Sequence, residues 1–203
     1  MVYLIGGAPR VGKSIAAKTL ADEKKCLVVS TDDLSEQVKM ATPESERLSK
    51  FPFPGFSGKA AENILTSEQL VELQLVTARS VEAELCRMVV EMVNKNESVV
   101  IEGVLILPEQ ALELITKHGD ENIRALFVGS SDVELVVAGI LKNDRADNWL
   151  RESNEEVIRQ VADFSVVYSE YVCDQAETTG LDYMERTEDF EADVKQLVEA
   201  MVQ

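Results

Sequence analysis

The glycine-rich segment near the N-terminus has residue types and spacing that suit phosphate binding. The pattern GxxxxGK[ST] is met by a segment that directly follows an apolar run: Gly7, Ala8, Pro9, Arg10, Val11, Gly12, Lys13 and Ser14. Glycines let the backbone wrap closely, so that successive N–H groups and a following helix N-terminus point at phosphates. Lys13 is expected to bridge the β- and γ-phosphates as a catalytic residue, and the Ser14 hydroxyl is expected to ligate Mg²⁺. A structural turn is the alternative, but the context of strand and helix favours a nucleoside triphosphate site.

Two carboxylates follow the second apolar run of the sequence. Asp32 and Asp33 come directly after Leu27–Ser30. The carboxyl ends of parallel strands lie at one edge of a sheet, together with the glycine-rich segment, so ligands collect there. A carboxylate at that edge can accept the proton of an acceptor hydroxyl or hold Mg²⁺ through water, and we favour Asp32 for both roles. The alternative for this pair is to cap the helix that begins near Leu34.

A third carboxylate lies inside the longest apolar run. Glu102 follows Val99-Val100-Ile101 and precedes Gly103. A carboxylate in an apolar strand is costly to bury unless it is paired or close to a metal ion. Proteins with this glycine-rich loop place an acidic residue at such a position to support Mg²⁺. Ser14, Asp32 and Glu102 are therefore the predicted metal-binding residues.

Three basic residues cluster between two predicted helices in the second half of the chain. They are Lys142, Arg145 and Arg151. Cations at this place can close over a triphosphate and neutralise the charge that develops during transfer, so we predict catalytic roles for Arg145 and Arg151. The alternative is ion pairing with the neighbouring acidic residues, which are Asp144, Asp147 and Glu152.

The composition excludes several partners. The formal net charge of −17 argues against nucleic acid or an anionic membrane as the main partner, since both would be repelled. The three cysteines, Cys26, Cys86 and Cys173, are far apart and form no CxxC pair, which is typical of reduced thiols. The first residues run straight into the glycine-rich segment with no charged leader or long apolar stretch. We therefore expect a cytoplasmic protein.

Apolar runs alternate with helix signals along the 203 residues, as is typical of a parallel sheet flanked by helices. The predicted strands are Val2–Ile5, Leu27–Ser30, Ser98–Leu107, Ile123–Gly129 and Leu181–Met184. Capping-box spacing predicts helices that start at Thr66, Ser131 and Ser153. The helix after Thr66 is long, and its residues Leu75 and Val76 are candidates for a homodimer face.

One segment departs from this alternation. Residues 51–56 read Phe-Pro-Phe-Pro-Gly-Phe and hold half of the six phenylalanines in the chain. The two prolines exclude a regular helix there. The sequence does not assign a role to this segment.

The glycine-rich segment, Asp32 and Glu102 together resemble the P-loop class of small-molecule and nucleotide kinases. The resemblance is to bacterial AAA-type kinase-like proteins similar to 2-phosphoglycerate kinase and adenylate kinase, and the matching segments are 6–14, 30–32, 101–104 and, more loosely, 125–129. It implies a three-layer α/β/α fold with a five-stranded parallel sheet in the order 2-3-1-4-5. It also implies one domain, residues 1–203, with a substrate-binding insertion at about 33–97 and a mobile lid at about 142–153.

The leading functional hypothesis is Mg²⁺-dependent phosphoryl transfer from ATP to a small-molecule acceptor, either a metabolite or a nucleotide. An ATP-binding regulatory or interaction protein without a second substrate is the alternative. A GTPase is disfavoured, because it would need Asn-Lys-x-Asp late in the fold, and the nearest match, residues 94–97, ends with Glu and precedes the third strand. The sequence does not identify the acceptor.

Overall fold

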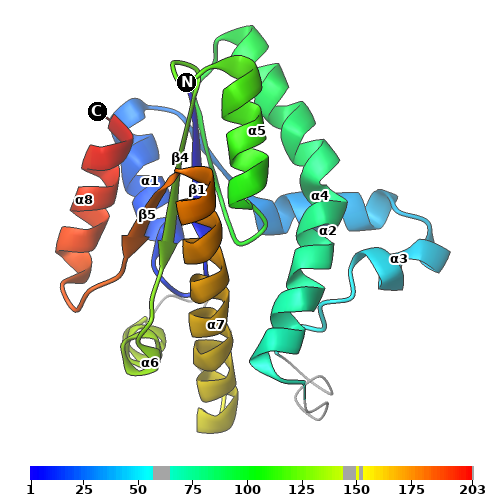
Figure 1. Ribbon diagram of the computed structural model, residues 1–203, viewed down its shortest axis with the longest axis vertical. Helices are drawn as coiled ribbons and strands as arrows, with labels where there is room; N and C mark the ends of the chain where they lie inside the picture. The colour runs from blue at the N-terminus through cyan, green and yellow to red at the C-terminus, as the bar shows by residue number, and fades with distance from the viewer. Residues whose placement is uncertain (57–64, 144–149, 151–152, 203) are drawn as a thin grey trace.

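The computed structural model describes residues 1–56, 65–143, 150 and 153–202, and it shows a parallel sheet between two layers of helices (Figure 1). Within these residues the sheet has five strands in the order β2-β3-β1-β4-β5, and every pair is parallel. The strands are β1 (Val2–Gly7), β2 (Leu27–Ser30), β3 (Val99–Glu102), β4 (Ile123–Gly129) and β5 (Asp182–Glu185). The predicted fold class and strand order are therefore confirmed.

Helices cover both faces of the sheet. They are α1 (Lys13–Lys24), α2 (Thr31–Ala41), α3 (Glu44–Lys50), α4 (Ser67–Lys95), α5 (Pro108–His118), α6 (Val133–Lys142), α7 (Glu155–Thr179) and α8 (Phe190–Val202). One layer contains α1 and α8, and the other contains α4, α5 and α7 (Figure 1). Helix α6 packs on α7, while α2 and α3 extend from the sheet beside α4.

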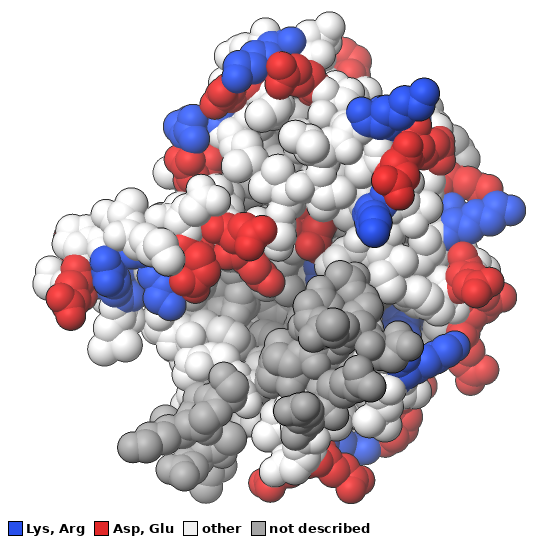
Figure 2. Space-filling model, turned by 180° about the vertical axis from the view of Figure 1, so that it is seen from behind, with Lys and Arg blue, Asp and Glu red and all other residues white. Residues whose placement is uncertain are grey.

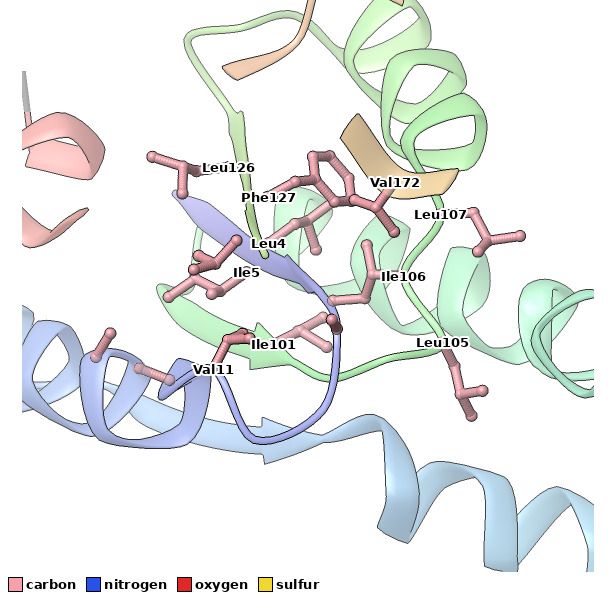
Figure 3. Packing of buried hydrophobic residues seen from close by; sticks show 14 of the residues in the cluster. Leu4, Ile5, Val11, Ile101, Leu105, Ile106, Leu107, Leu126, Phe127 and Val172 are labelled. Carbon is pink, nitrogen blue, oxygen red and sulfur yellow. The ribbon is translucent and has the colours of Figure 1, made fainter. Parts of the chain in front are cut away.

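The core lies around the central strand. Every residue of β1 is buried, because a parallel strand with helices on both faces has no solvated side. Leu4 pairs in register with Ile101 of β3, and Ile5 pairs with Leu126 of β4 (Figure 3). The edge strand β2 differs, since its Leu27 is 77% exposed. The glycine-rich loop therefore emerges from the best-buried strand of the sheet.

The three helix starts predicted from capping boxes agree with the structure to within one residue, whereas α2 begins at Thr31, three residues before the expected start near Leu34. Thr66 caps α4 in a capping box, as predicted. The helices predicted to start at Ser131 and Ser153 instead have Asp132 and Asn154 as N-caps, and those side chains accept backbone N–H groups of the first turn. Asp and Asn are at least as good as Ser at this position, so the neighbouring residue takes the role.

The surface of the described residues carries charges of both signs. On the face shown in Figure 2, basic and acidic side chains lie interspersed. All three cysteines are free thiols. Within the described ranges, none of the helices combines the length and apolar character needed to cross a membrane.

The third strand ends earlier than the sequence predicts. It stops at Glu102 instead of continuing to Leu107, because Gly103 has a φ of 148° and turns the chain. A Cβ atom on Gly103 would lie 1.7 Å from Oγ1 of Thr31, whose side chain is fully buried. The turn holds Glu102 at the last position of the strand.

We therefore expect Gly103→Ala to lower the free energy of unfolding by about 3 kcal/mol or more, through backbone strain together with the clash at Thr31. Urea unfolding checks this. Gly180→Ala is the matched control, because Gly180 also has a positive φ, 69°, but has open space around it. It should cost only about 1 kcal/mol, and equal losses for the two variants would contradict the role of the close contact.

Candidate nucleotide and phosphoryl-transfer site

The loop between β1 and α1 has the backbone geometry of an anion cradle. Gly7, Arg10 and Gly12 have positive φ angles of 121°, 64° and 98°. A Cβ atom on Gly7 would lie 1.9 Å from the carbonyl oxygen of Val128, so only glycine fits there. Gly12 precedes α1 without a side-chain cap, which leaves the first N–H groups of the helix available to an anion.

Lys13 begins α1 and lies inside this loop. Its side chain is only 5% exposed, and its ammonium donates a hydrogen bond to the carbonyl oxygen of Ala8. Burial lowers the pKa of Lys13, while the nearby carboxylates of Glu102 and Asp32 oppose that shift. A cation held in this way is ready to exchange a carbonyl oxygen for a phosphate oxygen.

Glu102 lies next to the loop because of the strand register. It pairs with Ile5 of β1 and with Ser30 of β2, so it stands at the carboxyl edge of three adjacent strands. The hydroxyl of Ser14 donates a hydrogen bond to Oε1 of Glu102, at 3.1 Å. Burial raises the pKa of Glu102. The charge of Lys13 and the hydrogen bond from Ser14 lower this pKa, but the net shift is upward. The structure thus brings the predicted residues Ser14 and Glu102 into direct contact.

Asp32 lies in the first turn of α2, directly beyond β2. Ser30 is the N-cap of this helix, and its hydroxyl accepts the backbone N–H of Asp32 at 3.2 Å, so capping is not the role of the Asp32 side chain. Asp32 is exposed and lines the same cleft as Lys13 and Ser14. Asp33 is not among the residues that line it.

The donor set suits Mg²⁺ in its chemistry. A hydroxyl and carboxylate oxygens are the hard ligands that Mg²⁺ takes, and it commonly keeps several waters besides one or two carboxylates. Burial and, to a smaller extent, the neighbouring Asp32 raise the pKa of Glu102, and a divalent cation between these carboxylates would favour their charged forms. Ser14, Glu102 and Asp32 therefore fit the ion that the sequence predicts.

The described residues enclose a cleft of about 1020 Å³ beside the loop. Its floor is the carboxyl edge of the sheet, and one wall is formed by α4, α7 and the segment 51–56. Ligand pockets commonly measure about 300 to 1,000 Å³. This cleft therefore has room for a nucleotide and a small second ligand together.

Comparison with known proteins finds likeness in structure alone. No family model and no curated protein matches the sequence. Among solved structures, the chain is similar to shikimate kinase from Bacteroides thetaiotaomicron, with a TM-score of 0.54 at 14% identity over 100% of this chain and 99% of that one. The fold is that of the P-loop small-molecule kinases. The chain is also similar to a gluconokinase from Sinorhizobium meliloti, with a TM-score of 0.54 at 12% identity over 99% of this chain and 90% of that one. A third similar structure is dephospho-CoA kinase from Campylobacter jejuni, with a TM-score of 0.51 at 13% identity over 99% of this chain and 95% of that one.

In this fold, one helix holds the loops of the site in place, which the sequence did not indicate. On α7, Ser165 donates a hydrogen bond to the carbonyl oxygen of Pro9 in the P-loop, at 2.6 Å, and Tyr168 donates to that of Val104, at 2.5 Å. The hydroxyl of Ser169 accepts the backbone N–H of Ser130 after β4, at 2.9 Å. Helix α7 thereby links the loops that follow three strands.

We expect Ser165→Ala to weaken ATP binding, because the P-loop loses the hydrogen bond at Pro9. One lost hydrogen bond corresponds to about 1 kcal/mol, or roughly a fivefold rise in Kd. Calorimetric titration with MgATP measures this. Ser80→Ala is the matched control, since the Ser80 hydroxyl bonds only within its own helix, to Val76. An unchanged Kd for Ser165→Ala would show that the loop is held by other contacts.

Arg186 and Phe190, beyond the end of β5, also line the cleft, and the sequence did not predict them. Nη1 of Arg186 donates to the carbonyl oxygen of Arg10 at 3.1 Å, and the guanidinium lies 5.4 Å from the centre of the Phe190 ring. A Cβ atom on Gly12 would lie 2.4 Å from that ring. Their position in the sequence was the available signal for these two residues, because the parallel strand β5 ends at the same edge of the sheet as the P-loop.

Two predicted catalytic residues, Arg145 and Arg151, lie outside the described residues, as does most of the predicted lid. The nearest described residues are Lys142 and Asn143, at and after the end of α6, and both line the cleft. The roles of the two arginines remain predictions.

Proposed function

We propose that the protein is an ATP-dependent kinase that transfers the γ-phosphoryl group to a hydroxyl of a small molecule. The observation that carries this proposal is the single cleft in which Lys13, Ser14 and Asp32 face the same space as the wall of α4, α7 and residues 51–56. A donor site alone would not need that second wall. The kinase fold of the compared structures supports the proposal.

The described residues account for the transfer step. The P-loop N–H groups and Lys13 bind the β- and γ-phosphates and stabilise the charge on the moving group. The carboxylate of Asp32 accepts the acceptor's hydroxyl proton while the new bond from its oxygen to phosphorus forms. The bond between the γ-phosphorus and the bridging oxygen breaks, and its electron pair leaves with ADP. Ser14, Glu102 and Asp32 would hold Mg²⁺, which would neutralise part of the charge on the phosphates.

The insertion supports this function over the alternative of an ATP-binding regulatory protein. A regulatory protein would offer the segment 51–56 to a partner, whereas a kinase needs it to line a cavity. Phe51, Phe53 and Phe56 all line the cleft. We therefore assign the acceptor site to the proposed insertion at about 33–97, and a closing role to the proposed lid at about 142–153, within one domain of 203 residues. A homodimer through α4 remains a prediction. Val76 is 38% exposed and so available to a second copy, whereas Leu75 already packs partly against the core.

The test is consumption of MgATP by the purified protein in the presence of a library of hydroxyl-bearing metabolites, with ADP and the phosphorylated product measured by mass spectrometry. We expect at least one acceptor to be phosphorylated stoichiometrically with ADP release. Failure to bind MgATP would overturn the proposal. MgATP binding without turnover on any acceptor would favour the regulatory alternative.

A further inference from the structure

An aromatic wall lines part of the cleft that also contains the P-loop residues Lys13 and Ser14. Its phenylalanines come from two distant segments, with Phe53 and Phe56 before α4 and Phe164 on α7. The ring centre of Phe164 lies 5.5 Å from that of Phe53 and 5.3 Å from that of Phe56, and Phe53 meets Phe56 edge to face at 5.6 Å. Such contacts fix the rings relative to one another. Phe56 and Phe164 are only 8% and 2% exposed, whereas Phe53 is half-buried, so Phe53, held in place by the two buried rings, offers most of the aromatic surface to a ligand.

A buried amide stands beside this wall. Gln74 of α4 is only 5% exposed and lines the cleft, yet its side chain makes no hydrogen bond to any residue that the structure describes. Its neighbour Thr77 differs, since that hydroxyl donates to the carbonyl oxygen of Leu73 at 3.2 Å. The Gln74 amide is not among the fully buried polar groups that lack a partner, because it opens on the cleft. Its two donors and its acceptor are therefore available to a ligand in the cleft.

The same wall is uncharged. The described basic residues that line the cleft are Arg10, Lys13, Lys39, Lys142 and Arg186, and none of them comes from α4, α7 or the segment 51–56. Lys39 of α2 lies 3.6 Å from Glu36, so its charge is already partnered. Carboxylate and phosphate ligands are usually bound by arginine or lysine. The described acceptor wall is therefore unsuited to an anionic group.

From the wall, the amide and the lack of charge among the described residues of this wall, we infer that the phosphoryl acceptor is an uncharged aromatic alcohol whose ring edge carries hydrogen-bonding groups. This inference rests on the proposed kinase function. The ring packs on Phe53, Phe56 and Phe164, the Gln74 amide pairs with the polar ring edge, and the hydroxyl reaches towards Asp32. Nucleosides and simple substituted aryl alcohols share this chemistry, and the test separates them.

The test compares matched probes by ligand-observed NMR titration, with the protein saturated by Mg²⁺ and a non-hydrolysable ATP analogue. The probes are 4-(hydroxymethyl)benzamide, its carboxylate counterpart 4-(hydroxymethyl)benzoate, its saturated counterpart 4-(hydroxymethyl)cyclohexanecarboxamide, and cytidine. We expect the benzamide to bind at least about tenfold more tightly than the benzoate and the saturated amide. Tighter binding of cytidine than of the benzamide would identify a nucleoside as the acceptor, and the reverse order would identify a smaller aryl alcohol.

Two variants test the named contacts. Gln74→Leu keeps the side-chain size and should weaken benzamide binding about tenfold, the equivalent of one good hydrogen bond. Phe53→Leu should weaken the benzamide several-fold and leave the saturated amide unchanged. Gln196→Leu, on the exposed side of α8, is the control and should change nothing. Unfolding curves establish that each variant is folded.

The outcomes separate this inference from the function on which it rests. If MgATP binds but the benzoate binds as well as the benzamide, or Gln74→Leu has no effect, the acceptor class is wrong while the kinase proposal stands. If MgATP binds and none of the four probes does, the acceptor class is likewise overturned. If MgATP does not bind, both fail.

Discussion

Lys13→Ala is expected to lower the turnover of ATP by about 100- to 1,000-fold, the usual effect of removing one group that stabilises developing charge. The side chain is almost fully buried inside the P-loop, and Glu102 and Asp32 are the carboxylates whose charges act on it most strongly. A water molecule in place of the Lys13 ammonium is neutral, so it would not offset the negative charge of the bound phosphates. Steady-state ADP release measures the loss, and calorimetric titration shows how much of it arises in MgATP binding.

The matched control for Lys13→Ala is Lys18→Ala on the same helix. Lys18 is exposed and lies outside the cleft lining, so its removal changes the net charge equally and leaves the site intact. Wild-type turnover in Lys18→Ala, together with a folded but inactive Lys13→Ala, assigns the effect to the position of the charge. Equal turnover by the wild type, Lys13→Ala and Lys18→Ala would show that the Lys13 ammonium has no role in catalysis.

The sequence was sufficient to predict the sheet and the donor half of the site because both depend on local patterns. A buried parallel strand is an almost continuous apolar run, so β1 and β4 could be predicted from the sequence. The P-loop has a fixed spacing, because its glycines are required by close contacts such as that of Gly7 with Val128. Once parallel order is assumed, all strand ends share one edge, which places Asp32 and Glu102 beside the loop.

The acceptor half depends on contacts between residues that are far apart in the sequence. Phe164 and Phe53 are separated by more than a hundred positions and meet only because α7 packs against the segment before α4. Gln74 looks like an ordinary helix residue until its burial and lack of a partner are known. Arg186 follows a short strand with no motif around it. Pairings of this kind are set by tertiary packing, which periodicity and spacing do not encode.

Asp32→Asn is expected to reduce the rate of phosphoryl transfer by about 100- to 10,000-fold, the range for loss of a general base. The amide keeps the size and the backbone position of the side chain, which Ser30 holds through the N–H of residue 32, but it cannot accept the proton. Binding of MgATP should change much less than turnover, because Lys13, Ser14 and Glu102 remain. Single-turnover kinetics with saturating acceptor separate the two effects.

Asp33→Asn is the control that decides between the two adjacent carboxylates. Both residues are exposed in the first turn of α2, but only Asp32 lines the cleft, so Asp33→Asn should keep near-normal turnover. If Asp33→Asn is the inactive variant, α2 must rotate when the acceptor binds. If neither variant loses activity, the proton goes to Glu102, the remaining carboxylate of the site, whose raised pKa reflects burial and the same two neighbours. Loss of turnover in Asp32→Asn alone, with MgATP binding retained, assigns the proton transfer to Asp32.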